Sequence, residues 1–188
     1  MAKAIKKKTV SKKTSTSKTK KASAGKASAR PSRAKATSVD RLPALTLPAT
    51  GGRSVALSQL KGNFVVLYFY PKDSTPGCTL EGRDFSRLYD SFRRLGAEVF
   101  GVSRDSLKSH ENFKAKEGYC MDLLSDADEK LCQALGVIKM KNMYGRQVRG
   151  IERSTFLVDR DGRLVKEWRG VKVPNHAEEV LEFLRSLT

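Results

Sequence analysis

The stretch that decides the fold is NFVVLYFY, residues 63–70, followed directly by PKDSTPGCT, residues 71–79. The first segment is a continuous run of β-branched and aromatic residues of strand length, which is typical of a strand covered on both faces. The second segment is rich in turn formers, and Thr75 followed by Pro76 is typical of the N-cap and first position of a helix. We therefore expect a central strand, a loop and a helix in that order.

The pattern continues outward as alternating strands and helices. A helix that follows the loop should end near Gly96, with four inward positions: Leu80, Phe85, Leu88 and Phe92. Further segments fit strands at 98–102 and 121–124, helices at 106–117, 128–135 and 176–187, an opening hairpin at 45–47 and 54–57, and a closing hairpin at 153–158 and 163–168. This order predicts an α/β fold, a central mixed β-sheet flanked by helices.

Charge is distributed unevenly along the 188 residues, which carry 37 Lys and Arg against 20 Asp and Glu, a net charge of +17. Residues 1–38, the N-terminal basic segment, hold 13 of the cations and no acidic residue, so residues 39–188 retain 24 cations against 20 acids, or +4. The segment has almost no bulky apolar residue and cannot offset the entropy of ordering, so we predict a disordered tail ahead of one domain, residues 39–188.

Lysines spaced among Ala, Ser and Thr can neutralise phosphates and bind DNA or RNA without sequence preference. The candidate contacts are Lys6, Lys7, Lys8, Lys12, Lys13, Lys20 and Lys21. A solubilising extension and an organellar transit peptide are the alternatives that the composition leaves open.

Hydropathy and cysteine content restrict the class of protein that the sequence can represent. The longest apolar run, 64–70, is far shorter than the roughly 20 residues needed to cross a bilayer, so we expect no membrane span and no secretory signal. Three cysteines, an odd number, do not suggest a disulfide framework. We expect reduced thiols in a cytoplasmic protein, with nucleoid or nuclear association if the basic segment binds nucleic acid.

Cys78 is the strongest candidate for a reactive residue. It would lie in the first turn of a helix, where unpaired N–H groups and the helix dipole favour an anion, here a thiolate. The alternative is a small buried hydrophobic residue, the common fate of a free cysteine. The polar, turn-rich surroundings of Cys78 favour the reactive interpretation.

These residues carry a family resemblance. Pro71, Thr75 and Cys78, in the spacing Pro-x-x-x-Thr-x-x-Cys after a strand, resemble the active-site motif of peroxiredoxins, and FYPKDSTPGCT resembles the bacterioferritin comigratory protein, or peroxiredoxin Q, branch. The likeness continues through EVFGVSRD, LLSDADEKLCQALGV and GIERSTFLVDRDG. It implies a thioredoxin-like fold and thiol-dependent reduction of hydrogen peroxide and organic hydroperoxides, with no cofactor or metal, and with thioredoxin or another thiol as reductant. We also expect a monomer.

The resemblance assigns roles to four residues. Cys78 would be the peroxidatic cysteine that becomes a sulfenic acid, and Arg153, just before STFLVD, would face both thiolate and peroxide. Thr75 would hydrogen-bond the substrate or the sulfur, and Pro71 would shield the sulfenate from water.

The chain departs from a common pattern of this branch at the resolving cysteine. Where many members carry a cysteine five positions after the peroxidatic one, this chain has Arg83. Cys120 and Cys132 are the intramolecular alternatives. Cys132, at helical spacing with apolar neighbours, and Cys120, beside Tyr119, both suit core positions, so resolution by an external thiol and by a non-standard partner both stay open.

Other functions and residues have weaker support. A disulfide reductase would need Cys-x-x-Cys, but Cys78 is followed by Thr79, Leu80 and Glu81. A nucleic-acid-associated protein whose folded domain is a redox or structural module is the competing hypothesis. His110 and His176 are isolated and do not predict a metal site, and Trp168 is more typical of a core than of a binding site.

Overall fold

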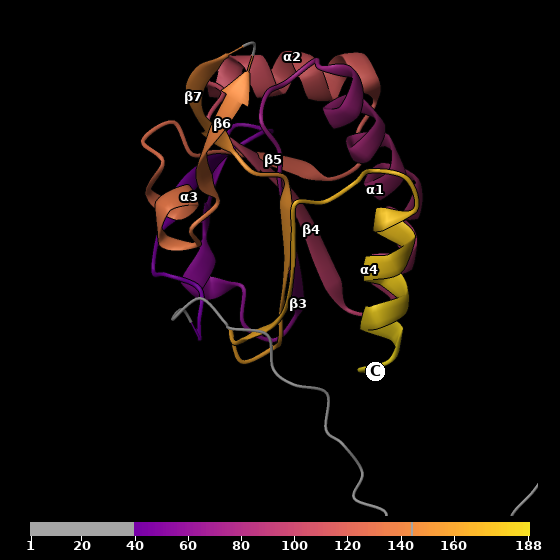
Figure 1. The fold of residues 1–188 in the computed structure, drawn as a ribbon. Coiled ribbons are helices and arrows are strands. Elements are labelled where there is room, and N and C mark those ends of the chain that lie inside the picture. Colours follow the sequence, from indigo (N-terminus) through magenta and orange to yellow (C-terminus); the bar gives the residue numbers. More distant parts are fainter. Residues whose placement is uncertain (1–39, 144) are drawn as a thin grey trace, which may run out of the picture. The chain divides into compact units, whose positions relative to one another are not determined.

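The protein is represented by a computed structural model that describes residues 40–143 and 145–188 (Figure 1). The N-terminal basic segment and Tyr144 lie outside the described residues. The division of the chain into residues 1–38 and 39–188 therefore stays a prediction. No helix in the described ranges combines the length and apolar character that crossing a membrane requires.

A mixed seven-stranded sheet is the centre of the fold. β3 (Phe64–Phe69) lies between β4, to which it is parallel, and β8, to which it is antiparallel, and all six of its residues are buried. The predicted strand is thus confirmed as an interior strand with both faces covered. The strand order is β2-β1-β5-β4-β3-β8-β9, with β1 Thr46–Ala49, β2 Arg53–Ala56, β4 Ala97–Ser103, β5 Asp122–Ser125, β8 Ser154–Val158 and β9 Leu164–Arg169.

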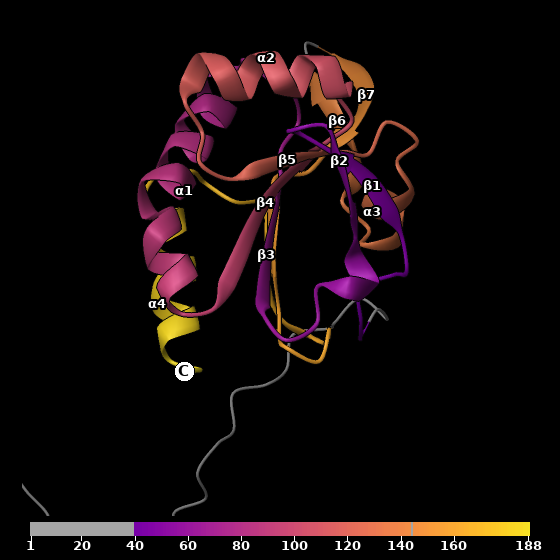
Figure 2. The same cartoon turned by 180° about the vertical axis from the view of Figure 1, so that it is seen from behind.

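Helices cover both faces of the sheet. α1 (Pro76–Arg94) and α4 (His176–Arg185) lie side by side on one face, and α3 (Lys130–Ala134) lies on the other (Figures 1 and 2). α2 (Leu107–Glu117) crosses the end of the sheet at which β3 runs into α1, and a short 3-10 helix spans Leu57–Gln59. The predicted sheet flanked by helices is confirmed.

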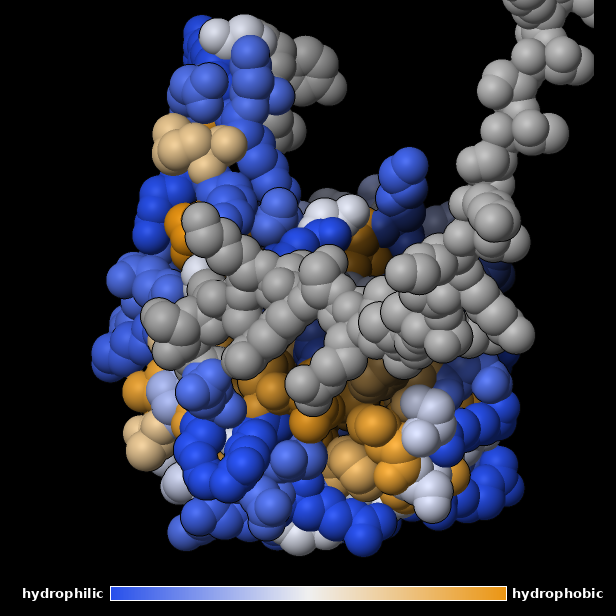
Figure 3. Space-filling model, turned by 60° about the horizontal axis from the view of Figure 1, so that its bottom comes forward, coloured by the Kyte–Doolittle hydropathy of each residue, from blue (hydrophilic) through white to orange (hydrophobic). Residues whose placement is uncertain are grey.

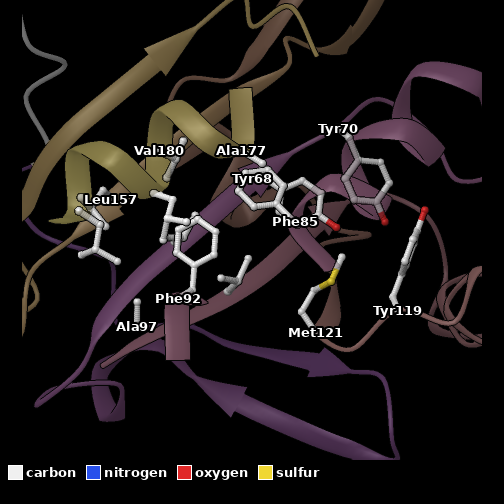
Figure 4. Close-up of a cluster of buried hydrophobic side chains, with 14 of the residues drawn as sticks. Tyr68, Tyr70, Phe85, Phe92, Ala97, Tyr119, Met121, Leu157, Ala177 and Val180 are labelled. Carbon is white, nitrogen blue, oxygen red and sulfur yellow. The ribbon is translucent and has the colours of Figure 1, made fainter. Parts of the chain in front are cut away.

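Two apolar clusters fill the space on the two sides of the sheet. The first lies between the sheet and α1 with α4, where the rings of Tyr68 and Phe85 stack at 4.6 Å (Figure 4). Tyr70 and Tyr119 lie at one end of this cluster, with their hydroxyl groups directed away from its aliphatic part. The second cluster includes Leu131 and Cys132 of α3. Because Cys78 belongs to the first cluster, the sheet separates it from Cys132.

Two features differ from the sequence-based expectations. Phe85 and Phe92 of α1 are buried as predicted, but Leu80 is 47% exposed, so its assignment as an inward position is wrong. The buried face of α1 includes Cys78, Glu81 and Phe85, and Leu80 lies on the opposite face of the helix. The sequence pattern also missed the two-stranded sheet of β6 (Ile138–Met143) and β7 (Arg146–Ile151).

The end of the molecule opposite α2 carries the turn between β8 and β9. Seen from that side, hydrophilic side chains form much of the rim and hydrophobic side chains gather toward the middle (Figure 3). Leu42, Leu60 and Leu164, from segments at this end, are partly buried and pack against the second cluster. α1 begins at the other end of the molecule, beside α2.

Candidate active site

The loop between β3 and α1 places Cys78 as the sequence predicts. α1 begins at Pro76 with Thr75 as N-cap, so Cys78 is the third residue of the helix. Thr75 does not cap the helix with its side chain, because its hydroxyl donates to the carbonyl oxygen of Lys72 at 3.0 Å. Pro71, half-buried, follows directly on the end of β3. The residues of the Pro-x-x-x-Thr-x-x-Cys motif thus lie on one short loop and the first turn of α1.

Cys78 is only 2% exposed and belongs to the first apolar cluster. Burial alone would suit an inert structural cysteine. What sets this thiol apart is its neighbour: Nη2 of Arg153 donates to the Cys78 Sγ atom at 3.3 Å. The sulfur of Cys78 thus has a cationic donor beside it in the first turn of a helix.

Arg153 is held in place by a carboxylate. It lies in the short connection between β7 and β8, and its Nη1 atom pairs with Oε2 of Glu81, one turn after Cys78 on α1. One guanidinium therefore contacts both the sulfur and the carboxylate. A Cβ atom at Gly77 would lie 3.3 Å from Nη2, so the absence of a side chain there makes room for Arg153.

Glu81 is a buried acid with one unpaired oxygen. Burial raises its pKa to about 7, although the charge of Arg153 and its hydrogen bond act in the opposite direction. Its Oε1 atom has no hydrogen-bond partner among the described residues. Burial by itself lowers the pKa of Arg153, but Glu81 and Cys78 raise it above its usual value, so the guanidinium stays charged.

Sequence reasoning missed Glu81 and a second cation, Lys141. Burial lowers the pKa of Lys141, which also interacts electrostatically with Arg153 and Cys78. Glu81 could have been found, because a residue three positions after Cys78 lies on the same helix face. Lys141 lies on a strand that the pattern did not reveal, so no local signal pointed to it.

The other two cysteines differ in their surroundings. Cys132 is fully buried, as predicted, and its N–H donates to Oδ2 of Asp126 at 2.7 Å. Burial, followed by the interaction with Asp126, raises the pKa of the Cys132 thiol. Cys120 is exposed, so its expected core position is wrong. It follows the last turn of α2 on an irregular segment, where its N–H donates to Oγ of Ser86 at 2.9 Å and the side chain faces outward.

The two histidines, predicted as isolated, each have a buried partner. His110 lies 2.9 Å from Oδ2 of Asp73 through Nδ1, and His176 lies 2.8 Å from Oγ1 of Thr155 through Nε2. Burial lowers the pKa of His176 to about 4. Within residues 40–143 and 145–188, His, Cys, Asp and Glu side chains form no cluster of three suited to a metal ion.

Trp168 packs beside α4. Its ring centroid lies 5.6 Å from that of Phe183 and its Nε1 atom donates to Oε1 of Glu179 at 2.7 Å. The expectation of a packing role for Trp168 agrees with these contacts.

The fold is a mixed sheet with helices on both faces, and its site is a thiol in the first turn of a helix with a guanidinium beside the sulfur. These two features define the class of thioredoxin-like thiol redox proteins. Residues 39–167 match the model of the AhpC/TSA family, and the chain belongs to that family. It is a peroxiredoxin, an oxidoreductase that reduces peroxides at the expense of a thiol.

Individual relatives support this placement. The chain is 54% identical over 153 residues to a peroxiredoxin Bcp of Xanthomonas campestris pv. campestris, covering 79% of this chain and 96% of the relative. It is 48% identical over 148 residues to a peroxiredoxin Bcp of Bacillus subtilis, covering 79% of this chain and 94% of the relative. A solved structure of the Xanthomonas campestris bacterioferritin comigratory protein, from work on its alkyl peroxide reduction activity, matches with a TM-score of 0.74 at 54% identity, covering 78% of this chain and 96% of that one.

Proposed function

We propose that Cys78 is the peroxidatic residue and that Arg153, Thr75 and Pro71 form its site. The observation that carries the proposal is the 3.3 Å contact between Nη2 of Arg153 and the sulfur of Cys78, in the first turn of α1. A thiolate there can attack the terminal oxygen of a hydroperoxide. The S–O bond forms as the O–O bond breaks, so the sulfur becomes a sulfenic acid and the leaving oxygen takes a proton to give water or an alcohol.

Arg153 supplies the main electrostatic contribution. Negative charge moves from the sulfur to the leaving oxygen during attack, and a fixed guanidinium beside both atoms stabilises it without reorganising. The hydroxyl of Thr75, which donates to the Lys72 carbonyl in this structure, would instead hydrogen-bond the peroxide when the peroxide binds. Pro71 would keep water from the sulfenate. Hydrogen peroxide and organic hydroperoxides are the proposed substrates, because the thiol attacks the peroxide bond that they share.

Further thiols must then return the sulfenic acid to the thiol state. We propose thioredoxin as the final reductant, either by direct attack on Cys78 or after a disulfide with Cys120. Attack of one thiol on the sulfenic acid forms the S–S bond and releases water, and the thiols of thioredoxin then reduce that bond, so that Cys78 leaves as a thiol and thioredoxin becomes a disulfide. Cys132 is the weaker partner, because it is fully buried on the other side of the sheet.

The test measures hydrogen peroxide consumption with a thioredoxin system, together with single-turnover oxidation of the protein by peroxide. Cys78→Ser should abolish both. Cys132→Ala is the matched control, because it also removes a buried thiol, and its single-turnover rate should stay close to that of the unmodified protein. Full turnover by Cys78→Ser would refute the assignment of Cys78. Disulfide mapping after one equivalent of peroxide separates an external reductant from Cys120.

The charge of the N-terminal basic segment favours a second activity. Its 13 cations without one acidic residue support sequence-independent binding of DNA or RNA, which would hold the peroxidase on nucleic acid. In the competing hypothesis, nucleic-acid association is the main activity and the folded domain is only a redox or structural module. Loss of peroxide turnover in Cys78→Ser argues for the first arrangement.

A further inference from the structure

Asp73 is the most strongly anchored residue of the loop that carries the site. Its N–H donates to Oδ2 of Asp105 at 2.8 Å, and its carboxylate accepts from the hydroxyls of Tyr70 at 2.8 Å and Ser109 at 2.7 Å. Its Oδ2 atom also lies 2.9 Å from Nδ1 of His110. Through this one side chain the loop is tied to the end of β3 and to α2.

Both ring nitrogens of His110 have a hydrogen-bonding partner. Its Nε2 atom lies 3.2 Å from the carbonyl oxygen of Leu124, which can only accept, so Nε2 carries a proton. Burial by itself raises the pKa of Asp73, but the hydrogen bonds of His110 and Ser109 bring it below the usual value, so the carboxylate is ionised. The Nδ1 atom faces that carboxylate, 3.1 Å from Oδ1 and 2.9 Å from Oδ2 of Asp73. His110 and Asp73 thus form a buried hydrogen-bonded pair.

The residue after Asp73 is in a strained conformation. Ser74 has a φ angle of 56°, in the left-handed region that residues other than glycine rarely adopt. Such a conformation persists only where its neighbours hold it. On one side Asp73 is fixed by the contacts above, and on the other side Thr75 donates to the carbonyl oxygen of Lys72.

We propose that Asp73 and His110 are positioning residues of the peroxidase site. Their buried pair holds the loop of residues 71–75, against the strain at Ser74, in the conformation that places Cys78 beside Arg153. The hydrogen bonds described for Asp73 and His110 do not include Cys78, so both act through the loop. The inference rests on the proposed role of Cys78.

The first test is Asp73→Asn, which keeps the size of the side chain and removes its charge. We expect the second-order rate of Cys78 oxidation by hydrogen peroxide to fall at least tenfold. The matched control is Asp126→Asn, because Asp126 is also buried and accepts from the N–H groups of Leu131 and Cys132 at the start of α3. It should lower the melting temperature and leave the peroxide rate within twofold of the unmodified protein.

A rescue distinguishes positioning from general destabilisation. Ser74→Gly removes the strain, because glycine adopts positive φ angles freely, so adding it to Asp73→Asn should restore the rate at least threefold. If Asp73→Asn does not fold, Ser109→Ala removes one hydrogen bond to the same carboxylate and should lower the rate at least threefold. A rate within twofold of the unmodified protein in the folded variant, or no gain from Ser74→Gly, would overturn the proposal.

Full activity of Asp73→Asn with an inactive Cys78→Ser would refute this inference alone, whereas an active Cys78→Ser would refute the proposed function itself.

Discussion

At the scale of single residues, the site depends on one guanidinium shared between a sulfur and a carboxylate. Lysine in place of Arg153 keeps the charge but has no fork, so it cannot contact Cys78 and Glu81 together. We expect Arg153→Lys to lower the second-order rate of peroxide reduction by roughly 10²-fold to 10³-fold, the range for loss of one preorganised donor. Stopped-flow oxidation measures it, and a rate within threefold of the unmodified protein would mean that charge alone suffices.

The buried acid Glu81 gives a prediction for stability against pH. Its folded-state pKa of about 7 lies above the 4.5 of an unperturbed glutamate carboxyl, so burial favours the protonated form. Its contribution is then fully present below about pH 4.5 and is lost as the pH rises through about 7. The loss is on the order of 3 kcal/mol at most, from about 1.4 kcal/mol for each pKa unit.

Glu81→Gln tests this, because the amide is nearly isosteric and does not titrate. Between pH 5 and pH 8 the free energy of unfolding of the unmodified protein should fall relative to that of Glu81→Gln, as measured by urea denaturation. Both proteins retain the histidines, so their titration cancels in the difference. Parallel stability curves would show that Glu81 stays ionised across this range.

Residues of the site were predictable to the extent that they are close in sequence. Pro71 and Thr75 lie in the loop after β3 and Cys78 lies in the first turn of α1, so their proximity follows from local structure. Arg153 was found only through the family resemblance, since no local rule joins it to a residue 75 positions away. No sequence pattern indicated the pairing of Asp73 with His110, because the two residues meet only where α2 packs across the loop.

At the scale of elements, sequence pattern predicted what is buried on a regular period. β3, with six buried residues, and α1, with Phe85 and Phe92 inside, are examples. The β6–β7 hairpin was missed because four consecutive residues of β7 are exposed. In β7, RQVRGI, the apolar residues Val148 and Ile151 are three positions apart, so the segment lacks the period-2 alternation of a half-buried strand.

Close packing of α1 gives the prediction at this scale. A Cβ atom at Gly82 would lie 2.5 Å from Cζ of Tyr119, whose hydroxyl donates to the carbonyl oxygen of Thr79 at 3.0 Å. The ring cannot move without losing that bond, so Gly82→Ala should cost about 1–3 kcal/mol of stability despite the better helix propensity of alanine. Gly150→Ala is the control, since nothing lies within 4 Å of a Cβ there. Equal urea midpoints for the two variants would contradict this account.

At the scale of the whole molecule, the charge separates into two parts. Residues 39–188 are nearly balanced at +4, whereas the N-terminal basic segment holds 13 cations. The large hydrophobic side chains exposed among the described residues are Leu80, Met140, Val148, Val165 and Leu187. They are distributed over α1, β6, β7, β9 and the segment after α4, and the expected monomer stays a prediction.

The basic segment should therefore control binding to nucleic acid without affecting catalysis. Replacing Lys6, Lys7, Lys8, Lys12, Lys13, Lys20 and Lys21 by glutamine in the full chain removes seven cations and leaves the folded domain intact. Each cation that neutralises a phosphate releases a counterion and adds about 0.9 to the slope of log affinity against log salt on duplex DNA. We expect a shallower salt dependence and at least tenfold weaker binding at low salt, measured by fluorescence anisotropy, with an unchanged peroxide rate. Equal affinities and slopes for both proteins would show that these lysines only solubilise the chain, and a reduced peroxide rate would show that the segment reaches the site at Cys78.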